Sequence, residues 1–369
     1  MTEPWDTNGT GKPLTVQGDR TVLLEVNSDG FHEARDFLAR FAELEKSPEF
    51  FHTYRITPLS IWNAAASGLD ADAILEFLRS RSRYPVPPNV ERDVRENIRK
   101  YGLLRLARDD EGIWLESSDA ELLRDVTRNA AVKKLIGRSE AGERLLVPPE
   151  MRGEVKQALI RIGYPVEDLA GYVVGAPFEL RLRGTSRRDG TPFQLRPYQR
   201  DAADVFYAGG SEKGGSGVIV LPCGAGKTIV GLAAMQRVGA KTLVLTTNVV
   251  AVRQWKNELL DKTEIPEEEI GEYTGETKEV KAVTIATYQI LTYRRKKTDP
   301  FVHFDLFSMN EWGLVVYDEV HLLPAPVFRV TAEIQATRRL GLTATLVRED
   351  KKEDEVFSLI GPKKFDVPW

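Results

Sequence analysis

The hydrophobic positions in the first third of the chain recur every three or four residues, which predicts helices. One apolar stripe covers residues 37–44. Thr57, Asp70 and Asn89 each precede a further apolar stripe, and their side-chain oxygens can accept hydrogen bonds from a first helical turn. The pattern therefore predicts a largely helical region, whose last helix is closed by Gly102.

Two short apolar runs follow at residues 103–107 and 113–116, and the acidic turn with Gly112 between them predicts a β-hairpin. Helices followed by a hairpin are typical of winged-helix domains, which bind DNA or protein partners. The first part of the chain is therefore predicted to form a helical, winged-helix-like domain.

The pattern changes again near residue 145. Residues 145–147 predict a strand, residues 150–162 a helix, and the alternation over residues 178–182 another strand, which together indicate a small α/β domain. The polar stretch at residues 184–190 is predicted to be a linker. The predicted domains cover residues 1–116, 117–185 and 186–369.

A glycine-rich loop in the third domain predicts phosphate binding. A β-branched run at residues 217–221 leads into it and helical spacing follows, which is the context that such loops require. Lys227 would reach the β- and γ-phosphates and the Thr228 hydroxyl would bind Mg²⁺. The usual first glycine falls on Leu221, so the match is to the shorter G-x-G-K-T core. The predicted ATP-binding residues of this loop are Cys223, Gly224, Ala225, Gly226, Lys227 and Thr228.

Two adjacent carboxylates end a second buried run. Residues 312–317 are mostly apolar and lead into Asp318 and Glu319. A carboxylate beside the phosphate loop would hold Mg²⁺, and a second one would polarise the attacking water. The sequence therefore predicts a catalytic group of Lys227, Asp318 and Glu319, with Thr228 and Asp318 as the metal ligands.

Composition limits the partners. Fifty-one Lys and Arg residues against 55 Asp and Glu residues give a net charge of -4, so any DNA contact must be local. The single cysteine, Cys223, excludes an internal disulfide and is predicted to pack within its loop, and the four scattered histidines leave no zinc cluster. No signal segment or membrane-length apolar run is present, so the sequence predicts a cytoplasmic protein without membrane contact.

The tetrad Asp318-Glu319-Val320-His321 resembles the D-E-x-H box of superfamily 2 helicases. Further segments resemble the other motifs of their first motor lobe, in the same order, at residues 195–199, 246–255, 284–290 and 343–345. The segments that resemble the XPB family in particular are LPCGAGKT at residues 221–228, YDEVHLLPA at 317–325, GLTATLVRED at 341–350 and the N-terminal residues 53–68. This resemblance implies a RecA-like parallel-sheet lobe as the third domain and a damage-recognition domain as the second.

The resemblance also implies an activity: an ATP-dependent DNA helicase of 3′ to 5′ polarity that opens duplex DNA in nucleotide excision repair or transcription, with ATP and Mg²⁺ as cofactors. By the same resemblance, Gln199 and Arg196 read adenine. The residues implied to couple ATP to DNA are His321, Thr343, Ala344 and Thr345. A strand-separating wedge is implied at Arg348, Glu349 and Asp350.

Sequence-independent DNA binding is predicted to use a few local groups that hold phosphates without reading bases. The candidate contacts are Thr246, Thr247, Arg253, Gln254 and Thr287. The basic run at residues 294–297 is either a further DNA contact or an ordinary solvated loop. Trp255 and Tyr288 are predicted to be core anchors rather than platforms for base stacking.

Two other functions fit the same residues. One is a duplex-DNA translocase that never separates strands, and the other is a nucleotide-gated clamp whose first domains dock a partner. The expected partners are duplex or forked DNA and a repair nuclease or a transcription and repair factor. The few residues after Thr345 leave no room for a second motor lobe with its arginine finger, so we expect a piece or half of a longer motor, nearly inactive alone.

Overall fold

The computed structural model describes residues 11–137, 139–140, 144–211, 213–296, 302–303, 305–308, 311–334, 337–345 and 353–367. The chain divides into two compact units, the first ending at Gly102 and the second spanning Leu103–Val367. Each unit has a hydrophobic core of its own.

The first unit is a four-stranded antiparallel sheet with helices packed against it. Its strands, in the spatial order β1-β2-β4-β3, are β1 (Leu14–Val16), β2 (Thr21–Glu25), β3 (Glu43–Lys46) and β4 (Phe51–Arg55). Its helices are α1 (Phe31–Leu38), α2 (Pro58–Ala66), α3 (Ala71–Arg81) and α4 (Pro88–Lys100). The apolar stripe at residues 37–44 is divided between α1 and β3, so the helix predicted over that stripe is wrong, and the sheet of this unit was not predicted.

Local capping chemistry explains where the helices of this unit begin. Thr57 Oγ1 accepts a hydrogen bond from Ser60 N at 3.0 Å, and Asp70 Oδ1 accepts one from Ala73 N at 2.7 Å, as the sequence predicts. The last helix begins before Asn89, so that predicted cap is wrong; the Asn89 side chain instead donates to a backbone carbonyl of the β1–β2 turn.

The second unit begins with a five-stranded sheet in the order β7-β8-β6-β5-β9. Its strands are β5 (Leu104–Asp109), β6 (Gly112–Ser117), β7 (Ser139–Glu140), β8 (Arg144–Val147) and β9 (Val166–Asp168). The helices of this part are α5 (Ala120–Arg128), α6 (Ala130–Lys133) and α7 (Arg152–Arg161).

The predicted hairpin exists, but it belongs to this second unit. It is formed by β5 and β6; β6 pairs with β8, and β5 pairs with β9. These pairings explain why the compact units divide after Gly102, whereas the predicted boundary falls at residue 116. The hairpin is therefore not the wing of the preceding unit.

The rest of the second unit is built on a seven-stranded parallel sheet in the order β12-β13-β11-β14-β15-β10-β16. Its strands are β10 (Ser216–Val220), β11 (Thr242–Thr246), β12 (Ile270–Tyr273), β13 (Val283–Thr287), β14 (Leu314–Asp318), β15 (Arg338–Thr343) and β16 (Lys363–Asp366). Its helices are α8 (Pro197–Tyr207), α9 (Lys227–Val238), α10 (Val249–Lys262), α11 (Tyr288–Leu291), α12 (Asp305–Ser308), α13 (Ala325–Glu333) and α14 (Glu353–Leu359). This sheet confirms the predicted RecA-like lobe.

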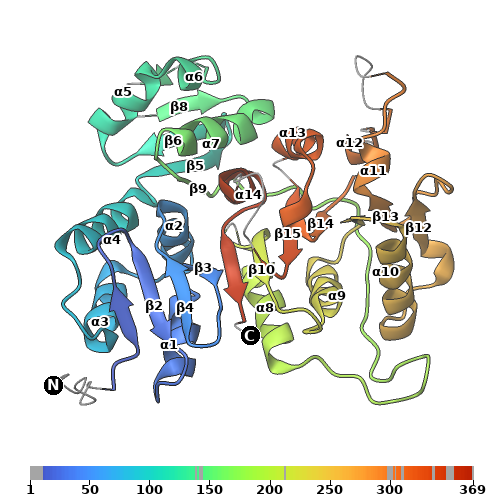
Figure 1. Ribbon diagram of the computed structural model, residues 1–369. Helices are drawn as coiled ribbons and strands as arrows, with labels where there is room; N and C mark the ends of the chain where they lie inside the picture. The colour runs from blue at the N-terminus through green and yellow to red at the C-terminus, as the bar shows by residue number, and fades with distance from the viewer. Residues whose placement is uncertain are drawn as a thin grey trace. The chain divides into compact units, whose positions relative to one another are not determined.

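Helices cover both faces of the parallel sheet. In Figure 1, α8, α9 and α10 lie below the sheet and α11 to α14 lie above it. Neighbouring residues of one strand serve the two cores in turn: Val316 packs with the α8–α10 side, and Val315 and Tyr317 pack with the other. Burial on both faces is the reason that these strands are continuous apolar runs in the sequence.

Residues 169–196, which follow β9, form no helix or strand. Within the alternation at residues 178–182, Leu182 forms an isolated bridge with Thr263, so the predicted strand is wrong. The polar stretch at residues 184–190 is not a free linker either. Ser186 is buried and donates to Asp261 Oδ1 at 2.7 Å, and the backbone N–H of Arg188 donates to the same oxygen at 2.7 Å.

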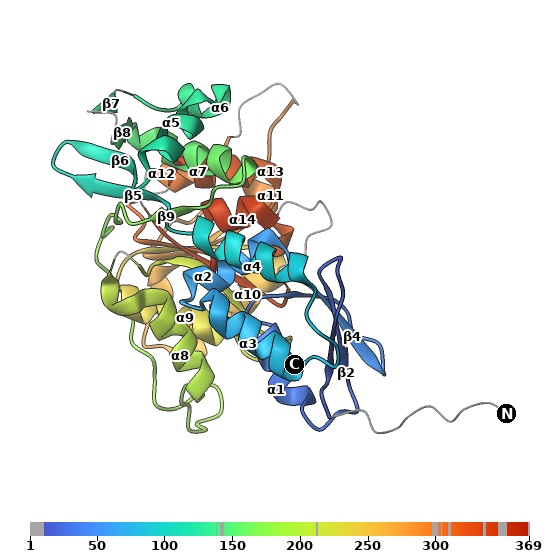
Figure 2. The same cartoon turned by 90° about the vertical axis from the view of Figure 1, so that its left-hand side faces the viewer.

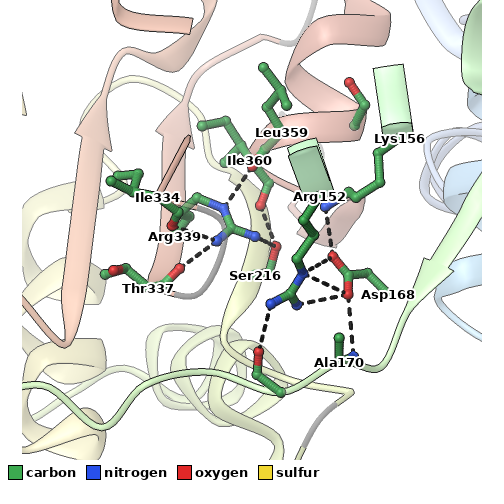
Figure 3. A network of polar contacts seen from close by, with 12 residues as sticks. Arg152, Lys156, Asp168, Ala170, Ser216, Ile334, Thr337, Arg339, Leu359 and Ile360 are labelled. Carbon is green, nitrogen blue, oxygen red and sulfur yellow. Dashed lines mark hydrogen bonds and ion pairs between the residues drawn. The ribbon is translucent and has the colours of Figure 1, made fainter. Parts of the chain in front are cut away.

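A buried group of charges lies where α7 meets the lobe (Figure 3). Arg152 Nη2 and Lys156 Nζ, both on α7, contact the two oxygens of Asp168 at 2.7 and 2.9 Å. Burial lowers the pKa of Lys156 to about 8. Figure 2 shows α7 beside α13 and α14, against which it packs.

Close packing keeps α7 on the lobe. A Cβ atom on Gly153 would lie 2.5 Å from the Ala332 carbonyl oxygen of α13, so only glycine permits this approach. Arg339 of β15 is fully buried next to the ion group, and its Nε donates to Leu359 O at 2.6 Å at the end of α14. A helix C-terminus favours a cation, so this contact stabilises the end of α14.

Candidate active site

Three neighbouring strands bring the predicted ATP-site residues to one edge of the parallel sheet. β10 leads into the glycine loop, β14 ends at Asp318, and β15, which lies between them, ends at Thr343. Since these strands are parallel, their carboxyl ends share one edge, where ligands of open α/β sheets bind. Motifs that are far apart in the sequence therefore lie together in the structure.

The glycine loop needs its glycines. Gly224 and Gly226 have φ angles of 80° and 79°, which L side chains rarely adopt. A Cβ atom on Gly226 would also lie 2.6 Å from Gln199 Nε2. The loop runs directly into α9, so the N-terminus of that helix is available for phosphate. Cys223 is exposed, so the prediction that it packs within the loop is wrong.

Two side chains of α8 hold the loop by one carbonyl group. Gln199 Nε2 and the Tyr198 hydroxyl both donate to Ala225 O, at 3.0 and 2.7 Å. Gln199 Oε1 also accepts from Arg196 N at 3.0 Å, and Gln199 is buried whereas Arg196 is exposed. The predicted adenine-reading residues therefore adjoin the phosphate loop.

Lys227 and Glu319 form an ion pair across the site. Lys227 Nζ lies 2.7 Å from Glu319 Oε1. Glu319 has a left-handed backbone, with φ at 50°, which is strained for a residue with a side chain. Its Oε2 atom is buried and makes no hydrogen bond within the described residues, although His321 Nδ1 lies 3.4 Å away. A buried carboxylate oxygen of this kind fits a site that receives a polar ligand.

Asp318 is held from within the protein. Trp255 Nε1 donates to Asp318 Oδ2 at 2.9 Å, and the Tyr288 hydroxyl donates to Asp318 O at 2.9 Å. Burial raises the pKa of Asp318; the Trp255 hydrogen bond and the Lys227 charge oppose that shift, and the charge of Glu319 adds to it. With Thr228 on the first turn of α9, the site offers a carboxylate and a hydroxyl.

These oxygen donors fit Mg²⁺ bound together with a nucleotide, because Mg²⁺ keeps several waters and takes few protein ligands. Among the described residues, no group of three or more His, Cys, Asp or Glu side chains forms a metal cage. Asp318 and Thr228 would hold the ion jointly with phosphate oxygens.

His321, which follows β14, contacts Thr343 at the end of β15. His321 Nδ1 lies 2.8 Å from Thr343 Oγ1, and Thr343 O accepts from Leu221 N at 2.9 Å. Thr345 N donates to Thr343 Oγ1 at 3.1 Å, which fixes the turn that contains Ala344. The four residues predicted to couple ATP to DNA thus share one hydrogen-bonded strand end.

The candidate DNA contacts differ in accessibility. Thr246 and Thr287 are buried; the Thr246 hydroxyl donates to Ala286 O, and Thr287 Oγ1 caps α11. The Thr246 side chain is therefore not available to DNA phosphate. Arg253 and Gln254 are exposed on α10, and Thr247 is half-buried at its start.

Part of the predicted DNA surface is not described. Arg348, Glu349 and Asp350 lie outside the described residues, as does residue 297 of the basic run; Arg294, Arg295 and Lys296 are exposed.

Sequence reasoning missed the three polar contacts made by aromatic residues. It did not assign Tyr198 to the loop carbonyl, and it treated Trp255 and Tyr288 as core anchors alone. Both are indeed buried. The available signal was that Trp and Tyr usually find a hydrogen-bond partner when buried.

A RecA-like motor lobe of the superfamily 2 helicase type is the class of protein that this fold and site define. The family model described as the type III restriction enzyme res subunit matches residues 192–348, and the one described as the helicase conserved C-terminal domain matches residues 14–141. Two relatives named DNA 3′-5′ helicase XPB, from Mycobacterium tuberculosis and Kineococcus radiotolerans, are each 52% identical over 98% of this chain. This chain belongs to the XPB family.

A more distant relative carries the same family name. A protein of Encephalitozoon cuniculi, named general transcription and DNA repair factor IIH helicase/translocase subunit XPB, is 33% identical over 98% of this chain. The chain spans 63%, 62% and 54% of the lengths of these three relatives. In the described part of the chain, no helix is long and apolar enough to cross a membrane.

Proposed function

We propose that this chain supplies the ATP-binding lobe of an ATP-dependent DNA helicase of 3′ to 5′ polarity, acting in nucleotide excision repair or transcription. The observation that carries the proposal is the ion pair of Lys227 with Glu319 beside the His321–Thr343 contact, at one edge of the sheet. The names of the relatives supply the polarity and the DNA substrate.

Each residue of the site then has a chemical task. Lys227 leaves Glu319 for the β- and γ-phosphates, which frees Glu319 to orient and polarise the attacking water. Mg²⁺, held by Thr228 and Asp318, would neutralise phosphate charge. Gln199 and Arg196 adjoin the loop from the side of α8, where adenine would be read.

DNA would be held at the ends of β11 and β13 by backbone groups near Thr247 and Thr287, with Arg253 and Gln254 beside them. Such contacts hold phosphates without base readout, so binding would be independent of sequence. The wedge of Arg348, Glu349 and Asp350 remains part of this proposal. A partner from a repair or transcription assembly is proposed from the name of the Encephalitozoon relative.

The test compares ATP hydrolysis on duplex DNA with unwinding of forked DNA by a longer protein that joins this chain to a second motor lobe, since the chain spans 63% of the length of its Mycobacterium tuberculosis relative. Replacing residues 348–350 by alanine should reduce unwinding more than hydrolysis. Hydrolysis on duplex without any unwinding would favour a translocase, and nucleotide-dependent DNA binding without hydrolysis would favour a clamp. DNA-stimulated hydrolysis that survives Glu319→Gln would contradict the proposed site.

A further inference from the structure

Asp318 accepts hydrogen bonds from one residue on each face of the parallel sheet. Trp255 belongs to the core on the α8–α10 side, and its indole N–H donates to Asp318 Oδ2 at 2.9 Å. Tyr288 belongs to the core on the opposite side, and its hydroxyl donates to the Asp318 carbonyl oxygen at 2.9 Å. One bond fixes the carboxylate and the other fixes the backbone that carries it.

Neither donor is free to move. Trp255 is 1% exposed and Tyr288 is 3% exposed. The indole also lies directly on α9, because a Cβ atom added to Gly231 would come within 2.5 Å of it. The indole ring is therefore packed between α10 and the helix that begins with Lys227, and Gly231 makes room for it.

A metal-binding carboxylate depends on such a partner. The indole nitrogen can only donate, so it occupies one carboxylate oxygen and sets the plane in which the other oxygen points. Outer partners of metal ligands typically change metal affinity or activity by about 10- to 100-fold when they are removed. A buried indole N–H needs an acceptor, and for Trp255 that acceptor is the carboxylate of Asp318, whereas for the buried Trp312 it is a backbone carbonyl.

We propose that Trp255 and Tyr288 are positioning residues that orient Asp318 for the Mg²⁺ of a bound nucleotide. This inference rests on the proposed function, which makes Asp318 the Mg²⁺ ligand. The proposal gives a functional role to two residues that would otherwise be regarded only as parts of the hydrophobic cores. The elements that carry them, α10 and α11, begin at the strand ends where DNA contacts are proposed.

The test measures nucleotide binding rather than hydrolysis. Binding of N-methylanthraniloyl-ADP to the whole chain is followed by fluorescence anisotropy, once with excess Mg²⁺ and once with EDTA, and the ratio of the two Kd values gives the gain from Mg²⁺. Trp255→Phe should reduce this gain by about tenfold or more and leave the Kd in EDTA unchanged. Tyr288→Phe should reduce it in the same direction.

Trp312 provides a matched control. It is a buried tryptophan of the same unit, 2% exposed, and its indole N–H donates to Leu306 O at 2.7 Å, a backbone carbonyl rather than an acid. Trp312→Phe should leave both Kd values unchanged. If Trp255→Phe weakens binding equally in Mg²⁺ and in EDTA, the residue is merely structural and the inference is overturned.

The variant Asp318→Asn distinguishes a failure of this inference from a failure of the proposed function, in which Asp318 binds Mg²⁺. Loss of the Mg²⁺ gain in Asp318→Asn but not in Trp255→Phe overturns the positioning role and leaves the metal ligand in place. Retention of the gain in Asp318→Asn overturns the metal assignment and the inference with it. Loss in both variants, with the Trp312→Phe control unchanged, supports the proposal.

Discussion

Lys227 Nζ lies 2.7 Å from Glu319 Oε1, so the cation proposed to meet the phosphates is held by the carboxylate proposed to activate water. In the proposed mechanism, nucleotide binding exchanges one partner of Lys227 for another. The two proposed catalytic charges would then neutralise each other until phosphate arrives, and water activation would depend on bound substrate.

The exchange predicts opposite effects on binding and turnover. Glu319→Gln removes the competing charge, so ATP should bind at least as tightly as in the wild type, while hydrolysis falls by about 10²- to 10⁴-fold because the base is lost. Lys227→Ala should weaken ATP binding. Calorimetric titration of this chain measures binding, and a phosphate-release assay on a protein that joins it to a second motor lobe measures turnover.

Arg237→Ala is the control for this pair. Arg237 lies near the other end of α9 and pairs with Asp204, away from the loop. It should change neither binding nor turnover. Weaker ATP binding by Glu319→Gln would show that the ion pair does not compete with nucleotide.

The contact between His321 Nδ1 and Thr343 Oγ1, at 2.8 Å, predicts a defect in coupling. Thr343→Val keeps the volume and removes the hydroxyl, which loses the contact with His321 Nδ1 together with the hydrogen bond from Thr345 N. The ratio of DNA-stimulated to basal ATP hydrolysis should therefore fall by at least about 2- to 10-fold, the size of one net hydrogen bond. Thr331→Val, which removes another buried hydroxyl on α13, should leave the ratio unchanged. Equal loss of basal and stimulated rates would argue against coupling.

How much the sequence predicts depends on how local each feature is. Gly226, Lys227 and Asp318 are predictable, because strand, loop and helix adjoin in the chain and parallel strands share an edge. The hydrogen bond from Trp255 to Asp318 joins residues 63 apart in sequence, and no periodicity reveals it. The hairpin of β5 and β6 was predictable as a hairpin, but its partners β8 and β9 are set by tertiary pairing.

Asp261 anchors the stretch at residues 184–190, which predicts its resistance to protease. Ser186 Oγ and Arg188 N both donate to Asp261 Oδ1 at 2.7 Å. Asp261→Ala removes this acceptor, so trypsin should cut after Arg187 and Arg188 several times faster than in the wild type. Limited proteolysis with mass spectrometry identifies the cuts. Asp204→Ala serves as control, and unchanged cleavage in Asp261→Ala would mean that other contacts hold the stretch.

The buried ion group predicts a large loss of stability on removing its carboxylate. Asp168→Asn takes the negative charge from Arg152 and Lys156, which both contact it at under 3 Å. Removing one partner of a buried pair costs about 3–5 kcal/mol, so the free energy of unfolding should fall by about that amount in urea. Glu179→Gln, from the exposed pair with Arg181, should leave it unchanged within error. A loss no larger than that of the control would show that the group is not energetically coupled.

The same ion group gives the second unit a defined dependence on acid. Burial alone would raise the pKa of Asp168. The charges of Lys156 and Arg152 outweigh burial and hold the pKa of this carboxyl well below its usual range. A carboxyl with a depressed folded pKa contributes stability that is complete above its unfolded pKa of about 3.9 and is lost as pH falls toward the folded value. The difference in unfolding free energy between the wild type and Asp168→Asn should therefore shrink as the pH falls below about 4. Between about pH 7 and about pH 5 the difference also reflects Lys156, whose pKa depends on the Asp168 charge. Urea unfolding below about pH 5 measures the effect, and a difference that widened below about pH 4 would contradict the assigned direction of the Asp168 shift.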